Sequence, residues 1–217
     1  MNIILTPAIP GGYQYRQSPN INLDELTYLL NLIEEIHLTL KESAKHTPFI
    51  TIHKLTGPMD QILASLKQIT QNTPPSANCL IALGLNAAQS DGRYHSSQGW
   101  RVISNPESPQ SSELATATAT AAIQTIGPRA ITLQSQKLSL QHLNQTPILT
   151  ALNIPAVLTL NLYQDNRQDA AYLLSSAGRQ AIIDLHVKGI SAYLDSLNLS
   201  DSPATNPTSS PRNRMHQ

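Results

Sequence analysis

The side chains that most readily bind a metal or move a proton are histidine, cysteine and the acidic residues. The chain has seven histidines and one cysteine among its 217 residues. No two histidines have the His-x-x-x-His spacing that places two imidazoles on one helix face. Cys79 lies in the apolar run 79–83, which indicates a buried, unreactive thiol, and a lone cysteine excludes both an intramolecular disulfide and a cysteine-rich zinc site. The histidines are His37, His46, His53, His95, His142, His186 and His216.

One polar loop, residues 89–95, brings Asp91 and His95 close together in the sequence. A metal-binding or acid–base role for this pair is one interpretation. A solvated loop histidine is the other, and we favour it. The sequence has no Gly-x-Ser-x-Gly elbow, P-loop or dinucleotide-binding fingerprint, so the common signatures of serine hydrolases and nucleotide-binding proteins are missing.

The elements that would position these side chains alternate between strands and helices. This alternation predicts a single α/β domain over residues 1–197, with a twisted, mostly parallel sheet flanked by helices on both faces. Residues 198–217 are rich in Ser, Pro, Asn and Arg, and we predict a disordered tail there. Apolar and β-branched runs predict strands at 2–6, 49–52, 79–83, 100–103 and 155–160.

Helix signals fill the intervals between these strands. Amphipathic stripes predict helices that begin at Asn20 or Asn22, near Pro58, and at Ser175 or Ser176. Segment 114–122 alternates like a strand but is rich in alanine, and we favour a helix. Two further elements are weaker predictions, a minor strand at 129–133 and a short helix at 139–151.

Composition restricts the partners. Lys plus Arg equals Asp plus Glu, 14 each, and no basic run occurs, so nucleic acid and anionic membranes are not expected partners. The apolar run 3–5 has no basic residue before it and stops at Thr6-Pro7, which differs from a secretory signal. No segment is long and apolar enough to span a bilayer. We therefore expect a protein that is cytoplasmic as synthesised, with its final location open.

Short motifs follow one another in a characteristic order from residue 2 to residue 195. A strand leads into a Gly-Gly loop, a central strand ends in a Gly-x-Asn-Ala segment, and a Pro-Ala-Val-Leu strand precedes an Asn and an Asp-x-x-x-Leu motif. The motifs occupy residues 6–12, 22–24, 81–87, 99–104, 111–115, 155–158, 166, 169–173 and 188–190. In this order they resemble the zinc-dependent N-acetylmuramoyl-L-alanine amidases of the type 3 fold.

The resemblance implies a specific chemistry and places it on numbered positions. In such amidases two histidines and a carboxylate hold zinc, and a separate Glu transfers the proton of the attacking water. The first histidine position is Ile9, or Pro10 if the loop is shifted by one residue, and the ligand Glu position is near Ser18. The second histidine position is Gly84, and the catalytic Glu position is Leu160. None of these is a usual zinc ligand or base, so we predict no metal ligands, no catalytic residue and no cofactor.

The same resemblance places Asn86, Trp100, Arg101 and Tyr163 around the substrate groove. One interpretation is a retained peptide- or glycan-binding surface with Trp100 as a stacking platform. The other is residual packing at strand ends, which we favour.

Two functional hypotheses follow. The first is a pseudoenzyme: a catalytically inactive amidase-like domain that acts as a binding or scaffold module, for example in a cell-envelope or phage-like assembly, with a protein or a peptidoglycan fragment as partner. The second is an active N-acetylmuramoyl-L-alanine amidase that uses zinc to hydrolyse the amide bonds of peptidoglycan stem peptides.

Overall fold

One mixed sheet organises the molecule. The computed structural model describes residues 1–8, 18–46, 49–89, 91–104, 108–130 and 147–200. Its five-stranded sheet has the order β2-β1-β3-β5-β4, and all neighbouring strands are parallel except β4, which runs antiparallel to β5. The mostly parallel α/β fold predicted from the sequence is thus confirmed. The strands are β1 (Asn2–Pro7), β2 (Thr51–Lys54), β3 (Asn78–Asn86), β4 (Arg101–Ser104) and β5 (Ala156–Tyr163).

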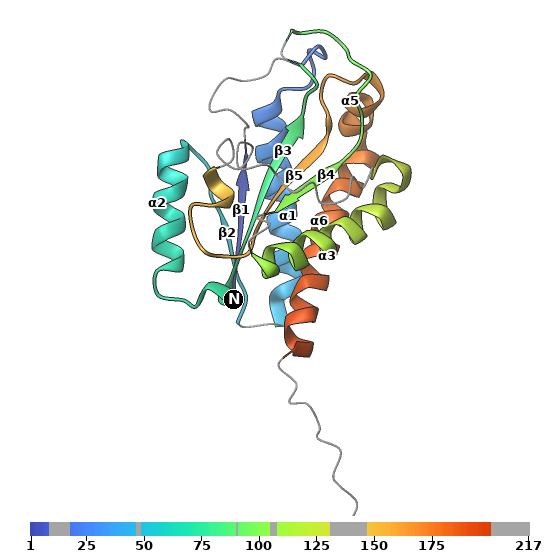
Figure 1. The fold of residues 1–217 in the computed structure, drawn as a ribbon. Helices are drawn as coiled ribbons and strands as arrows, with labels where there is room; N and C mark the ends of the chain where they lie inside the picture. Colours follow the sequence, from blue (N-terminus) through green and yellow to red (C-terminus); the bar gives the residue numbers. More distant parts are fainter. Residues whose placement is uncertain (9–17, 47–48, 90, 105–107, 131–146, 201–217) are drawn as a thin grey trace, which may run out of the picture.

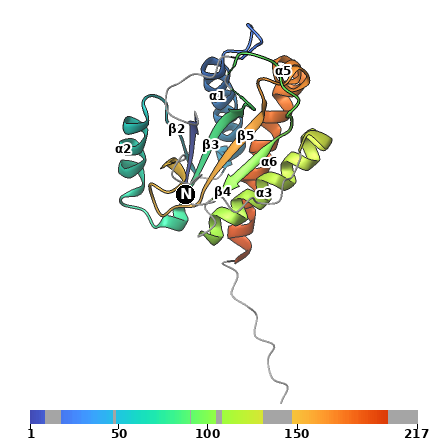
Figure 2. The same ribbon diagram turned by 45° about the horizontal axis from the view of Figure 1, so that its top comes forward.

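Helices cover both faces of this sheet, as predicted (Figures 1 and 2). The larger apolar cluster joins one sheet face to α1 (Glu25–Ser43), α3 (Pro109–Ile126), α5 (Arg167–Leu174) and α6 (Ser176–Ser200). The smaller cluster joins the opposite face to α2 (Met59–Thr70), to η4 (Pro147–Leu149) and to Ile154, which follows η4. Strand β3 is buried along its whole length, as a central strand covered on both faces requires. Among the described residues, no helix combines the length and hydropathy needed to cross a membrane.

The first helix begins later than predicted. Its N-cap is Asp24, whose carboxylate accepts a hydrogen bond of 2.8 Å from the backbone N–H of Thr27. This bond satisfies a free N–H group of the first turn. Hydrogen bonding from the side chain of Thr27, and then from its backbone N–H, lowers the pKa of Asp24. Asn20, one of the two predicted caps, lies in the turn that precedes the helix, where its side-chain oxygen accepts a hydrogen bond from the backbone N–H of Asn22.

The alternating segment 114–122 is helical, as favoured, and lies within α3. Ser108 caps this helix by accepting from the N–H of Ser111 at 3.2 Å. The threonine hydroxyls along the helix donate to carbonyls four residues earlier, so these β-branched side chains stay satisfied inside the helix. Apolar burial of Leu114 and Ala122 then fixes the helix against the sheet.

Several weaker predictions fall at the edges of the described chain. Residues 147–149 form a 3₁₀ turn where part of a short helix was expected, and residues 139–146 lie outside the described residues. Arg129 closes the 3₁₀ turn η3 (Gly127–Arg129), so the predicted minor strand does not begin there, and 131–133 are not described. Helix α6 continues to Ser200, three residues past the predicted domain boundary, and 201–217 are not described.

Candidate functional site

Two of the positions at which the sequence predicted lost chemistry, Gly84 and Leu160, lie side by side near the carboxyl ends of β3 and β5. Gly84 of β3 is the register partner of Leu160 of β5, and Leu160 in turn pairs with Arg101 of β4. Paired residues on neighbouring strands point to the same face. The register then shifts, so that Asn86 pairs with Tyr163. We call these five residues, together with Ala8, the strand-end cluster.

Gly84 is packed directly against the end of β1. A Cβ atom added at Gly84 would lie 2.7 Å from the carbonyl oxygen of Ala8 and 3.4 Å from a methyl group of Leu160. The backbone N–H of Ala8 donates to the carbonyl oxygen of Leu83 at 2.7 Å, which holds the two strands at this spacing. A histidine side chain has no room at position 84 on this backbone.

The side chains at the described ligand and base positions, Ser18, Gly84 and Leu160, do not fit a zinc ion. Gly84 and Leu160 offer no lone pair, and the Ser18 hydroxyl donates to the carbonyl oxygen of Gln164 at 3.0 Å while accepting from the N–H of Asn20 at 3.1 Å. Ile9 and Pro10, the remaining ligand positions, lie outside the described residues. Within the part of the chain that is described, no three His, Cys, Asp or Glu side chains gather to hold a metal.

The Asp91–His95 pair forms, as the sequence allowed, but it lies in a loop with a structural explanation. Asp91 Oδ1 and His95 Nε2 are 2.9 Å apart, and this contact lowers the pKa of Asp91. The backbone N–H of His95 donates to the carbonyl oxygen of Asp165 at 2.7 Å, and the Asn166 amide donates to the carbonyl oxygen of His95. These bonds tie the loop to the end of β5, which favours a solvated structural histidine over a ligand or base.

Two buried aspartates after β5 were not singled out as site residues. Asp165 Oδ2 accepts from the N–H groups of Ala88 and Gln89, at 2.8 and 3.1 Å. Asp169 Oδ2 accepts from the N–H groups of Gly99 and Tyr163, at 2.8 and 3.1 Å. Both carboxylates therefore connect β5 to the long segment between β3 and β4. The sequence signal was a run of polar residues, 164–169, directly after an apolar strand.

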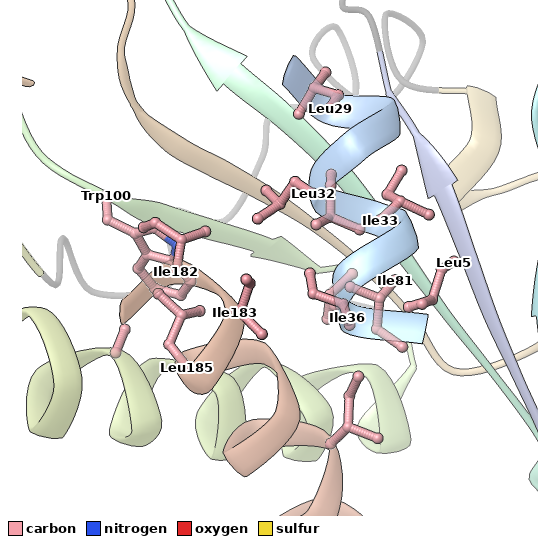
Figure 3. Packing of buried hydrophobic residues seen from close by; sticks show 14 of the residues in the cluster. Leu5, Leu29, Leu32, Ile33, Ile36, Ile81, Trp100, Ile182, Ile183 and Leu185 are labelled. Atoms are coloured by element: carbon pink, nitrogen blue, oxygen red, sulfur yellow. The ribbon is translucent and has the colours of Figure 1, made fainter. Parts of the chain in front are cut away.

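Trp100 is not the stacking platform that one interpretation required. Its side chain is 1% exposed and belongs to the larger apolar cluster, where it lies beside Ile182 of α6 (Figure 3). The indole N–H donates to Asn161 Oδ1 at 2.9 Å. Trp100 thus lies on the sheet face opposite Arg101, and its burial agrees with packing at a strand end.

Behind Trp100 lies a buried polar network that the sequence did not reveal. Asn161 Nδ2 donates to Thr159 Oγ1 at 3.2 Å and to the carbonyl oxygen of Gly84 at 3.3 Å. Thr159 Oγ1 is 2.9 Å from His186 Nε2, and His186 Nδ1 is 2.7 Å from the carbonyl oxygen of Ile182. The carbonyl requires a donor, so Nδ1 carries the hydrogen and Nε2 accepts from the threonine hydroxyl. Burial lowers the pKa of His186 to about 4.

The other three predicted groove residues lie together on the face of Gly84. Tyr163 is 4% exposed, and the Arg101 guanidinium is 5.7 Å from the centroid of its ring. Asn86 is 8% exposed, and its Oδ1 accepts from the neighbouring N–H of Ala87. Arg101 is the most accessible of the three.

Comparison with known proteins identifies the fold. The sequence matches no protein-family model and no curated protein. Among solved structures, an N-acetylmuramoyl-L-alanine amidase from Clostridium difficile 630 superposes with a TM-score of 0.69 at 16% identity, covering 90% of this chain and 97% of that one. The amidase Ami1 from Mycobacterium smegmatis gives a TM-score of 0.68 at 15% identity, with coverage of 90% and 97%. The CwlD amidase from Clostridioides difficile, solved in complex with the GerS lipoprotein, gives 0.64 at 16% identity, with coverage of 90% and 98%.

These structures cover nearly the whole described domain, so the chain has the fold of the N-acetylmuramoyl-L-alanine amidases. The resemblance inferred from the order of the motifs is confirmed at the level of fold. At sequence identities of about one residue in six, the activity of one protein cannot be inferred for another, because the chemistry depends on particular side chains.

Proposed function

We propose that this protein is a catalytically inactive amidase-fold domain, a pseudoenzyme that acts as a binding or scaffold module. The observation that carries the proposal is the contact at Gly84. The carbonyl oxygen of Ala8 lies 2.7 Å from the place where the first carbon of any side chain at this position would be, which is closer than such atoms approach in proteins. A metal ligand at position 84 would therefore require the end of β1 to move.

The missing chemistry has two parts. Amide hydrolysis by a zinc amidase requires a Lewis acid that polarises the carbonyl and a base that takes the proton of the attacking water. Leu160 occupies the family position of that base, and a hydrocarbon side chain cannot accept a proton. No neighbouring acid substitutes for it within the strand-end cluster, whose side chains are apolar, neutral or cationic.

A binding role agrees with what the chain retains. The chain has the amidase fold, and the segment between β3 and β4 is held to the end of β5 by hydrogen bonds from Ala88 to Asp165 and from Gly99 to Asp169. Binding is less costly when the surface is held in one conformation beforehand. The partner we propose is a peptidoglycan fragment or a protein of a cell-envelope or phage-like assembly. The CwlD amidase, solved with the GerS lipoprotein, is a precedent for an amidase fold with a protein partner.

The test is a zinc measurement on the purified chain, coupled to cleavage of muropeptides. We expect less than stoichiometric zinc after dialysis against the metal, and no release of L-alanine-linked peptide while a zinc amidase assayed in parallel is active. Stoichiometric zinc together with peptide release would establish the alternative, an active amidase, and end the proposal.

The two classes of partner are separated by retention on purified, insoluble cell wall. Retention would identify peptidoglycan as the ligand. If the chain is not retained on the insoluble cell wall and does not cleave it, the module would be assigned to protein partners.

A further inference from the structure

Strand β2 forms one edge of the sheet, and one side of its backbone is open (Figures 1 and 2). The N–H groups of Thr51 and Leu55 donate to carbonyl oxygens on the β1 side of the strand, at 2.8 and 2.9 Å. Successive residues of a strand direct their N–H and C=O groups to alternate sides, so those of Ile52 and Lys54 point away from β1. Within the part of the chain that the structure describes, no strand pairs with this outer side. An open edge of this kind is a template for another extended chain.

An apolar hollow of about 220 Å³ lies beside this edge. Ile50 and Ile52 line it from the β2 side, and Leu40 of α1 and Leu194 of α6 line it from the helices. Asp195 contributes a carboxylate to the lining, and it forms no ion pair among the described residues. A segment that paired with β2 would therefore cover apolar surface and lie close to an unpaired negative charge.

Two large apolar side chains near this edge are exposed. Phe49, two residues before β2, is 81% exposed. Leu38 is 55% exposed and lies one turn after Glu34 on α1. Glu34 contacts Lys54 of β2, and side chains one turn apart share a helix face, so Leu38 lies on the flank of α1 nearest this edge. Exposed apolar side chains around an unpaired strand indicate a protein contact.

The edge is complementary to itself in its hydrogen bonds. Two copies can pair antiparallel about a two-fold axis at Ile52, where the outward N–H and C=O groups of each Ile52 bond to those of the other. The same register sets Ile50 opposite Lys54 of the second copy, and both residues direct their backbone groups outward. A pair of chains would thus satisfy the open side of β2 and join the two sheets into one.

The side chains match in the same register. Lys54 of the second copy, which contacts Glu34 of its own chain, comes beside the hollow in which Asp195 lies, so a cation approaches the unpaired carboxylate. Continued past β2, this register brings Phe49 next to Leu55 of the second copy and covers both. The formal net charge of the chain is zero, so two copies do not repel each other as they approach.

From these observations we propose that β2 is a dimerisation edge, at which two copies of this chain pair their sheets antiparallel about Ile52. The edge lies across β1 from the strand-end cluster, so the contact is separate from the proposed binding site and does not depend on whether the chain is inactive. A strand of four residues and one small hollow bury little surface, and we expect a weak dimer with a dissociation constant of about 1–100 μM.

Cysteine cross-linking tests the register. Thr51 would lie opposite His53 of the second copy in a pair without hydrogen bonds, with Cα atoms about 4.5 Å apart, a separation that a disulfide spans. Two Thr51 residues, or two His53 residues, would be diagonal neighbours about 7–8 Å apart, which is beyond that range. A mixture of Thr51→Cys and His53→Cys chains should therefore form disulfide-linked dimers under mild oxidation, and each variant alone should form few. The native Cys79 is buried and does not take part.

Sedimentation measures the dimer itself. We expect the average mass of the wild-type protein to rise from that of one chain toward that of two as its concentration increases to about 100 μM. Phe49→Asp should raise the dissociation constant at least about tenfold, because it places a hydrated carboxylate beside Leu55 of the second copy. Ile21→Asp makes the same change at a side chain that is 96% exposed in the turn before α1, and it should leave the dimer intact. Both positions are exposed, so both variants should keep the urea midpoint of the wild type.

The proposal is overturned by a wild-type chain that stays monomeric at this concentration, which would leave the edge to a segment of another protein. It is also overturned by a cysteine mixture that forms no more linked dimer than the separate variants, or by a folded Phe49→Asp variant that dimerises like the wild type. None of these results changes the zinc and cleavage measurements, which test the proposed function separately.

Discussion

His186 makes the stability of the fold depend on pH in a calculable way. It lies on α6, is 1% exposed, and bonds through one ring nitrogen to Thr159 and through the other to the carbonyl oxygen of Ile182. The neutral tautomer satisfies both contacts. Protonation would place a charge in the core and make Nε2 a donor that faces the threonine hydroxyl. Burial accordingly lowers the pKa of His186 from 6.5 to about 4.

The sign of the effect follows from proton uptake. Between pH 6.5 and pH 4 the unfolded chain binds a proton at this histidine and the folded chain does not, so stability falls as the pH falls through this window. From pH 7 to pH 5 the loss is about 2 kcal/mol, because each unit of pKa difference corresponds to about 1.4 kcal/mol. Above pH 7 His186 contributes almost nothing to the pH dependence.

The assay is urea denaturation of the wild-type chain and of His186→Gln at pH 7, 6 and 5. Glutamine keeps one donor and one acceptor but cannot titrate. His37 and His53, whose pKa values are also lowered by burial, are present in both proteins, so their effects cancel in the difference. We expect the free energy of unfolding of the wild type to fall by about 2 kcal/mol more than that of the variant between pH 7 and pH 5. Equal pH dependence in the two proteins would refute a neutral, buried His186.

Three further predictions concern other buried contacts. Gly84→Ala should lower the free energy of unfolding by about 1–3 kcal/mol, since its Cβ meets a backbone carbonyl, and unchanged urea midpoints would contradict this packing. Asp169→Ala should cost about 2–3 kcal/mol by leaving two backbone N–H groups unpaired, and it should speed amide exchange at Gly99; exchange at wild-type rates there would disprove the contact. Cys79, whose pKa burial raises to about 12, should react with a thiol reagent only after unfolding, and rapid labelling of the native chain would show otherwise.

The fold was predictable because its signals are local and ordered. A continuous apolar run can be a strand only if both of its faces are covered, and segment 79–83 became the centre of the buried strand β3. For segment 114–122 the high helix propensity of alanine correctly favoured a helix over a strand, and threonines such as Thr118 fit because their hydroxyls donate to carbonyls within the helix. The N-cap of α1 was missed because three residues that commonly cap helices, Asn20, Asn22 and Asp24, lie within five positions, and local preference does not distinguish them.

The arrangement of the candidate site was only partly predictable. Asn86, Arg101 and Tyr163 were expected near one another, and they are. Trp100 was grouped with them by the family resemblance, but it is adjacent in sequence to Arg101, and adjacent residues of an extended chain point to opposite faces. Its indole reaches Asn161 on the other side of the sheet. That contact joins residues 61 positions apart, and no local pattern encodes it.

The register of β5 bears on whether the absent base reflects a misalignment of the motif. If the family's proton-transfer position were shifted by one residue, it would fall on Thr159 or Asn161, both of which are polar. Both side chains lie on the sheet face opposite Leu160: Thr159 bonds to His186, and Asn161 accepts from the indole of Trp100 and donates to the backbone carbonyl of Gly84. Only Leu160 shares the face of Gly84, and it is the register partner of that glycine. If the motif is aligned one residue earlier or later, the family position therefore falls on a polar side chain that is already bonded in the core, and no base is supplied at the face of Gly84.

The pairing of β3 with β5 becomes irregular further along, between Gly84 and Asn86, where Leu162 of β5 has a φ of 67°. This irregularity returns Tyr163 to the face of Gly84, and so places an aromatic ring, rather than a carboxylate, beneath Arg101.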